Sequence, residues 1–238
     1  VWLLAVAASI LKFANFTLVC GEDELVIERG LLERRKVTLP VKRIQAIRIV
    51  EEIVWQPFGL AAVHGVSVGY GNRKGETTLL MPLMAKRDIE RLLQAAVPRL
   101  AQNVETNFEP LPARARVGYV LPWTLVYAAL SAAVGYFQTW GWLGLIASLA
   151  ALLLGLWRFR DAGWSKRGDM LLLRTRLLSR MTLLVPRSRI QSCDMMRNPW
   201  QRRRGLSTFR VTVASGSSGS RYRLRGMRHE DSHALLDW

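Results

Sequence analysis

Forty consecutive residues, 118–157, contain no charged side chain. A helix needs about 20 apolar residues to cross the hydrocarbon core of a bilayer, so this run is too long for one span and suits two. We predict helices over Tyr119–Phe137 and Trp142–Trp157, joined by a tight turn at Gln138–Gly141. A buried helical hairpin in a soluble protein is the alternative, but core helices of soluble proteins normally carry a polar face.

Basic residues flank this run, whereas the turn at its centre has none. Arg114 and Arg116 precede the first helix, and four basic residues between positions 158 and 167 follow the second. Because positively charged flanks remain in the cytoplasm, we expect both polar segments there and only the turn outside. The opening run, residues 1–12, is too short to span alone, and we interpret it as the end of another membrane helix. A signal peptide is the less favoured interpretation, because no basic segment precedes the run.

The two polar segments are copies of one another. At a constant offset of 146 residues, Glu22–Gln45 aligns with Gly168–Gln191. Further on, Trp55-Gln56 recurs as Trp200-Gln201 after an adjustment of one residue. A repeat that is split by a membrane hairpin indicates two domains of the same fold. The predicted organisation is therefore a first domain, a linker, the hairpin and a second domain, at residues 13–100, 101–117, 118–157 and 158–238.

Within each copy the hydrophobic period is that of β-strands. Apolar and polar residues alternate over Ile44–Val50 and Val63–Tyr70, and glycine-containing turns separate such runs. Each copy closes with a segment of helical spacing, Met84–Leu93 in the first and Arg228–Leu236 in the second. Several short strands followed by one helix predict a small curved sheet or barrel closed by its C-terminal helix.

The most specific shared block has the pattern Pro-x-x-Arg-Ile-Gln. It comprises Pro40, Arg43, Ile44 and Gln45 in the first copy and Pro186, Arg189, Ile190 and Gln191 in the second. With the later Trp-Gln and Gly-Leu pairs, the terminal helix and the helix pair, this pattern resembles the bacterial pleckstrin-homology-like domain of type 2, and more narrowly the YdbT-like membrane proteins. The resemblance extends over residues 13–238.

This resemblance implies a mixed fold of β-strands and transmembrane helices in the bacterial inner membrane. Two PH-like, seven-stranded half-open β-barrels, each capped by a C-terminal helix, would be joined by the two-helix transmembrane hairpin, with both PH-like domains in the cytoplasm. No catalytic residue carries over from the family. We therefore expect a non-enzymatic protein without a cofactor.

The positive charge of the chain is concentrated in its second copy. The whole chain has a net charge of +16, and residues 158–238 hold 18 basic against 6 acidic side chains, compared with 12 against 10 in residues 13–97. A solvated surface with a positive-inside bias is one interpretation, and contact with anionic phospholipid is the other. Alternation along strands places several arginines on common faces, and a further three are consecutive in a loop. The candidate lipid-binding residues are Arg174, Arg176, Arg202, Arg203, Arg204, Arg221, Arg223 and Arg225.

One motif resembles a zinc site. His229-Glu230-Asp231-Ser232-His233 matches HExxH, in which two histidines hold zinc and the glutamate activates water. The aligned positions of the first copy are Lys86 and Glu90, which favours an ordinary helix N-terminus. We therefore predict no metal and rank a metallopeptidase last. No Walker loop, GxGxxG after a strand, or GxSxG is present in the sequence.

Two functions remain open. In the first, the PH-like domains bind anionic lipid headgroups, protein partners, or both. In the second, the protein is a scaffold that assembles with a sister PH-domain membrane protein, in envelope stress or antimicrobial-peptide resistance. Nucleic-acid binding is disfavoured, because arginines held against a membrane account for the charge with fewer assumptions.

Overall fold

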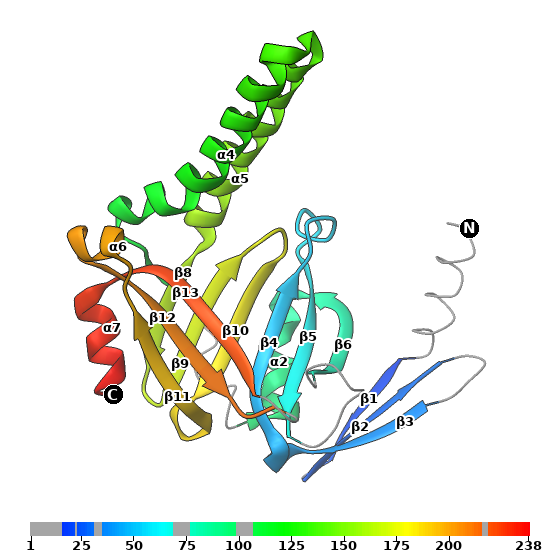
Figure 1. The fold of residues 1–238 in the computed structure, drawn as a ribbon. Helices are drawn as coiled ribbons and strands as arrows, with labels where there is room; N and C mark the ends of the chain where they lie inside the picture. Colours follow the sequence, from blue (N-terminus) through cyan, green and yellow to red (C-terminus); the bar gives the residue numbers. More distant parts are fainter. Residues whose placement is uncertain (1–15, 22, 31–34, 69–76, 99–106, 216–218) are drawn as a thin grey trace.

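The computed structural model describes residues 16–21, 23–30, 35–68, 77–98, 107–215 and 219–238. A body of β-strands lies at one end of the molecule, and a long hairpin of two helices projects from it (Figure 1). The predicted membrane-helix end at residues 1–12 lies outside the described residues.

The two sequence copies fold into matching series of elements. The first contains β1 (Thr17–Cys20), β2 (Glu24–Arg29), β3 (Arg35–Pro40), β4 (Ile44–Glu51), β5 (Leu60–Ser67), β6 (Thr77–Ala85) and α2 (Lys86–Ala96). The second contains β8 (Gly163–Arg167), β9 (Met170–Arg176), β10 (Arg180–Pro186), β11 (Ile190–Met196), α6 (Pro199–Arg203), β12 (Leu206–Val213), β13 (Ser220–Arg228) and α7 (His229–Leu236). Within the described residues each copy therefore has six strands, where the resemblance implied seven.

The two copies share one β-sheet. Its seven strands have the order β6-β5-β4-β10-β9-β8-β7, where β7 (Glu109–Pro110) is a short strand of the linker. Strand β4 of the first copy pairs antiparallel with β10 of the second, in a register that runs from Arg180 opposite Glu51 to Leu184 opposite Ile47. The remaining strands form two sheets of three, β1-β2-β3 and β11-β12-β13. The expectation of two separate half-open barrels thus gives way to a central sheet built by both copies.

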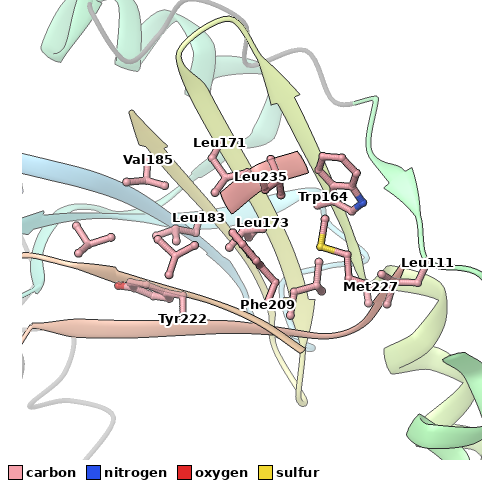
Figure 2. Packing of buried hydrophobic residues seen from close by; sticks show 14 of the residues in the cluster. Leu111, Trp164, Leu171, Leu173, Leu183, Val185, Phe209, Tyr222, Met227 and Leu235 are labelled. Carbon is pink, nitrogen blue, oxygen red and sulfur yellow. The ribbon is translucent and has the colours of Figure 1, made fainter. Parts of the chain in front are cut away.

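Both faces of the central sheet are buried. Leu172 and Leu184 point into a first core that is covered by β1–β3 and α2. Leu171, Leu173 and Leu183 point into a second core, which β11–β13 and α7 cover (Figure 2). Successive side chains of a strand point to opposite faces, so a strand buried on both faces needs an unbroken apolar run. The run Met170–Leu173 meets this requirement.

The Pro-x-x-Arg-Ile-Gln blocks form the turns by which each copy passes from one sheet to the next. Pro40 precedes a single 3-10 turn, Val41–Arg43, between β3 and β4, and Pro186 precedes the equivalent turn between β10 and β11. The Gln45 side chain is buried and its Nε2 donates to the Arg43 carbonyl oxygen at 2.9 Å. Arg189 of the second block donates to the Lys42 carbonyl oxygen of the first at 3.1 Å. The blocks are therefore structural turns that touch one another.

The two helices of the hairpin are present as predicted, but three of their four ends differ from the prediction. Helix α4 (Arg116–Phe137) starts three residues earlier than predicted and ends at the predicted residue. Helix α5 (Gly144–Asp161) starts two residues later and ends four residues later than predicted. A 3-10 segment, Thr139–Leu143, takes up the residues between them. In their most apolar windows only 6% of the first helix and 17% of the second are buried, which distinguishes them from the core helices of a soluble protein.

Candidate functional site

A pocket of about 860 Å³ opens where α4 leaves the second copy. One wall is apolar and belongs to α4, and the opposite side is formed by the ends of α5 and β11 together with β12 and β13. The volume lies within the range of small-molecule sites in proteins. The apolar wall includes Val117, Leu121, Pro122, Trp123 and Leu125, and the charged side includes Arg158, Arg197, Arg210, Arg223 and Arg225.

Strand alternation and register gather the arginines of the sheet. Tyr222 and Leu224 of β13 point into the second core, so Arg223 and Arg225 point outward. Arg223 lies opposite Arg210 of β12. The outward face of this three-stranded sheet therefore presents neighbouring guanidinium groups to the base of α4.

The arginines of the pocket form no ion pairs within the described residues, although Asp194 of β11 lies opposite Arg210 in the strand register. Among the described residues that line it none is acidic, and none of its five arginines forms an ion pair with a described carboxylate. Burial, followed by repulsion from Arg223 and Arg158, lowers the pKa of Arg225. In addition, the buried Nε of Arg197 has no hydrogen-bond partner among the described residues. Buried donors are normally satisfied, so this geometry favours a bound acceptor that carries negative charge.

Contacts from the membrane helices hold the pocket in shape. The Tyr119 hydroxyl of α4 donates to the Arg225 carbonyl oxygen at 2.8 Å. Nε of Arg158, near the end of α5, donates to the Arg176 carbonyl oxygen at 3.1 Å. Trp200 lies against α4 at Gly118, where an added Cβ would be 3.2 Å from its ring. The position of α4 and the geometry of the pocket are therefore coupled.

The Arg202–Arg204 cluster lies beside the pocket and does not line it. These residues lie at the C-terminus of the short helix α6, and Asn198 and Gln201 form a capping box at its N-terminus. Arg202 and Arg203 are exposed, and the Arg204 guanidinium lies 4.4 Å from the ring centroid of Trp200. Arg221 is exposed on the same face of β13 as Arg223 but outside the pocket lining.

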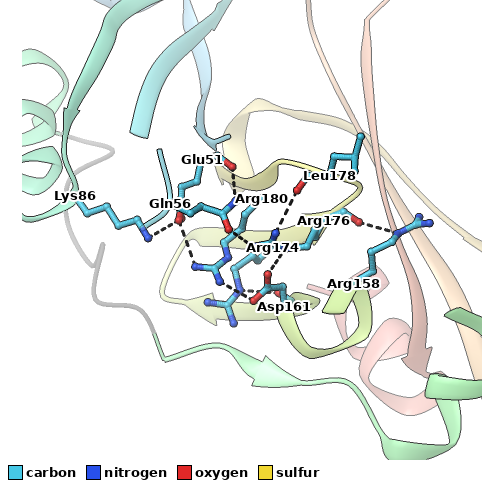
Figure 3. A network of polar contacts seen from close by, with 9 residues as sticks. All are labelled: Glu51, Gln56, Lys86, Arg158, Asp161, Arg174, Arg176, Leu178 and Arg180. Carbon is cyan, nitrogen blue, oxygen red and sulfur yellow. Dashed lines mark hydrogen bonds and ion pairs between the residues drawn. The ribbon is translucent and has the colours of Figure 1, made fainter. Parts of the chain in front are cut away.

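Arg174 and Arg176 lie in a different place, a polar network between the two copies and the hairpin (Figure 3). The Arg176 side chain is fully buried and forms an ion pair with Asp161, the last residue of α5. Arg180 bridges Asp161 at 2.7 Å and Glu51 of the first copy at 3.3 Å. Nε of Arg174 donates to the Asp161 carbonyl oxygen at 2.8 Å. Both of these candidate lipid-binding residues therefore contact other parts of the protein itself.

The HExxH segment forms the first turns of α7. The rings of His229 and His233 are 6.2 Å apart and perpendicular, and Nδ1 of His233 lies 2.9 Å from Oδ2 of Asp237. Between them Ser232 is buried, and its hydroxyl lies 2.6 Å from that of Ser207. Within the described part of the chain no three His, Cys, Asp or Glu side chains lie together in a way that could hold a metal ion.

Comparison with known proteins assigns the fold to a family. The model of the bacterial PH domain matches residues 1–97 and 113–238. The chain belongs to the bacterial PH domain family. It is also 33% identical, over its full length, to the UPF0699 transmembrane protein YdbT of Bacillus subtilis (strain 168), and it spans 48% of that relative's length. With two helices long and apolar enough to cross a bilayer, it is a bacterial PH domain membrane protein.

In this bacterial PH domain protein, sequence reasoning identified part of the pocket. Strand alternation pointed to Arg223 and Arg225, which line it. Arg158, Arg197 and Arg210 were missed, because each is isolated from the clusters that drew attention to the others. The internal repeat contained one signal that could have pointed to this region. Arg197 and Trp200 belong to the segment of the second copy that corresponds to the turn after β4 in the first.

Proposed function

We propose that this protein is non-enzymatic and binds the headgroup of an anionic phospholipid in the pocket at the base of α4. The observation that carries the proposal is that five arginines, with no acidic residue among the described residues that line the pocket, face an apolar wall that continues into a membrane-spanning helix. A phospholipid has the same division between a charged head and apolar chains. The pocket would therefore receive the phosphate at the sheet and the acyl chains along α4.

Guanidinium groups suit this ligand. Arginine offers planar pairs of N–H donors that match phosphate oxygens, and such charge-assisted hydrogen bonds are about twice as strong as neutral ones. The side chains of Tyr119 and Trp123 lie near the start of α4, where amphipathic rings favour the headgroup zone of a bilayer. We place this zone on the cytoplasmic side of the inner membrane, because the basic flanks of the hairpin favour that orientation.

The orientation has its own test. The protein should remain in membranes washed with alkaline carbonate, and a reporter fused at position 139 should map to the side opposite the β-sheets. Release by carbonate, or a reporter on the cytoplasmic side, would contradict the proposed topology.

Lipid binding is best measured on the full chain by native mass spectrometry. Detergent-solubilised protein is titrated with phosphatidylglycerol or phosphatidylcholine. We expect phosphatidylglycerol to bind preferentially and the double variant Arg223→Gln/Arg225→Gln to lose that preference. A hydrogen bond to a charged group contributes about 1.5–3 kcal/mol, so loss of two such contacts should weaken affinity at least roughly a hundredfold.

The matched control is Arg202→Gln/Arg203→Gln, which removes the same charge from the exposed helix α6. This variant should retain most of the affinity, because neither residue lines the pocket. If the α6 variant loses lipid and the β13 variant keeps it, the arginine triplet is the binding site and the pocket assignment is wrong. Equal binding of both lipids by the unaltered protein would contradict anionic selectivity.

A second candidate, assembly with another PH-domain protein, is favoured by the free edge of β11. Among the described strands β11 pairs only with β12, whereas its counterpart β4 pairs with β5 on one side and with β10 on the other. Gln191, Ser192, Asp194 and Met196 of β11 are also exposed. A strand equivalent to β10 from a sister membrane protein could pair with β11 in the same way. A photoreactive residue at Asp194 should then form an adduct that mass spectrometry identifies as a bacterial PH domain protein. Adducts with lipid alone would contradict this candidate.

A further inference from the structure

The turn between β4 and β5 exposes a group of large apolar side chains. Ile53, Val54, Trp55 and Phe58 are 40%, 66%, 39% and 70% exposed. The turn is nevertheless ordered by its own hydrogen bonds, among them those from the backbone N–H groups of Trp55 and Gln56 to the Glu52 carbonyl oxygen. It therefore presents these side chains on a defined scaffold.

A second apolar turn lies beside it. Leu177 and Leu178, between β9 and β10, are 65% and 54% exposed. Arg176 joins the two turns, since its Nη1 donates to the Leu178 carbonyl oxygen at 3.2 Å and its Nη2 to Oε1 of Gln56 at 2.7 Å. The six exposed residues of the two turns form one surface, which we call the apolar fringe: Ile53, Val54, Trp55, Phe58, Leu177 and Leu178.

The apolar fringe adjoins the point where α5 leaves the membrane. The Arg176 guanidinium lies 3.8 Å from the ring centroid of Trp157, in the last turns of α5, and forms an ion pair with Asp161 at the end of that helix. Leu177 and Leu178 directly follow Arg176 at the end of β9, so they lie beside the same end of α5. The β4–β5 turn projects toward the same side as the helical hairpin (Figure 1).

The sequence repeat supports the same placement. The segment equivalent to the β4–β5 turn in the second copy contains Trp200, which packs against α4 near Gly118. Both segments therefore lie at the membrane-facing end of their sheets. They differ in character, because Pro57-Phe58 stands in the first copy where the second has the arginine triplet.

We propose that the apolar fringe inserts into the interfacial zone of the bilayer leaflet beside the β-sheets. Aromatic side chains favour this zone, and soluble surfaces seldom expose contiguous apolar patches without a partner. The occupant is the bilayer itself, because the fringe is continuous with the end of a helix that already spans it. The central sheet is thereby held against the membrane beside the end of α5.

Spin-label accessibility tests this inference in full-length protein, in nanodiscs of phosphatidylcholine and phosphatidylglycerol that hold one chain each. Cys20 and Cys193 are replaced by serine, and a nitroxide is attached after Val54→Cys or Leu178→Cys. The control is Asp169→Cys, in the exposed β8–β9 turn at the opposite end of β9. We expect the ratio of collisions with oxygen to those with a water-soluble nickel chelate to be several-fold higher at 54 and 178 than at 169.

The result that overturns the inference is equal accessibility of all three labels to the nickel chelate. Shielding of positions 54 and 178 from both reagents also contradicts it, because that pattern indicates cover by protein. The use of two label positions in separate turns guards against local misfolding at either one. Lipid titration of the arginine pocket is unaffected by the outcome, so the two proposals fail independently.

Discussion

Asp161 is the residue at which the membrane hairpin meets both copies of the repeat. Its carboxylate forms ion pairs with Arg176 and Arg180 of the second copy, and Arg180 forms a further ion pair with Glu51 of the first (Figure 3). Charges this deeply buried are costly to leave unpaired, since breaking one partner of a buried pair costs about 3–5 kcal/mol. The network thus fixes how the three parts of the molecule are joined.

We predict that Asp161→Asn lowers the midpoint of thermal unfolding in detergent by roughly 6–20 °C, because the buried Arg176 loses its counter-charge. Removing both charges with Asp161→Leu/Arg176→Met should recover much of this loss. A double-mutant cycle in thermal unfolding measures the coupling. Additive effects of the two single substitutions would show that the pair does not act as a unit.

His64 provides a pH-dependent contribution to stability. Burial, and next the charge of Arg48, lower the pKa of His64 from 6.5 to about 4. The unfolded chain therefore binds a proton near pH 6.5, where the folded protein does not, and stability falls as the pH decreases from about 6.5 towards 4. The loss between pH 7.5 and pH 5 should be about 2 kcal/mol. The variant His64→Gln should show a smaller loss on acidification in the same unfolding assay, and an identical loss would contradict the assignment.

At the scale of elements, the hairpin depends on small residues where its helices cross. A Cβ at Gly155 would lie 2.8 Å from the Tyr119 carbonyl oxygen and 2.9 Å from Cα of Val120. The Ser131 hydroxyl donates to the Gly141 carbonyl oxygen at 2.8 Å at the far end of the hairpin. Close approach of two helix backbones in a membrane relies on such residues.

We expect Gly155→Leu to separate α4 from α5 and to cost about 1–3 kcal/mol by overpacking. Because Tyr119 also binds the backbone of Arg225, this substitution should weaken lipid binding as well. Ala150→Leu, at an exposed position of α5, is the matched control and should change neither property. Thermal unfolding and native mass spectrometry of the two variants decide between the outcomes.

Elements were predictable from the sequence to the extent that their signals are local. The uncharged run located both helices, and the offset of 146 residues transferred strand positions from one copy to the other. The boundaries of α5 were missed because Arg158 and Arg160, which suggested an end, continue the helix into the polar network. Strand partners were not predictable, because the alternation of apolar and polar residues indicates which face of a strand is buried but not which strand pairs with it.

At the scale of the whole molecule, the central sheet makes the copies interdependent. Without the first copy, β10 loses its pairing with β4, and Met170, Leu172 and Leu184 lose the core into which they point. The unbroken run Met170–Leu173 was the one sequence signal of this arrangement. The pocket likewise draws on both helices and three strands, so clusters of neighbouring arginines in the sequence located only part of it.

We predict that residues 158–238 expressed alone do not fold into a stable domain, since they would expose one face of β9 and β10. Their amide NMR spectrum should be poorly dispersed. Full-length protein cut by a protease site placed between residues 100 and 107 should keep its two parts associated during purification. A dispersed spectrum from the fragment would show that the second copy folds independently.

The most direct test of the arginine pocket is photo-crosslinking of lipid in native membranes. Thr208 and Thr212 lie on the same outward face of β12, but only Thr208 lines the pocket. A photoreactive amino acid at position 208 should yield phospholipid adducts enriched in anionic species, identified by mass spectrometry, and the same residue at position 212 should not. Adducts at 208 that merely match the bulk lipid composition, or no adducts there, would contradict the proposed binding of an anionic headgroup.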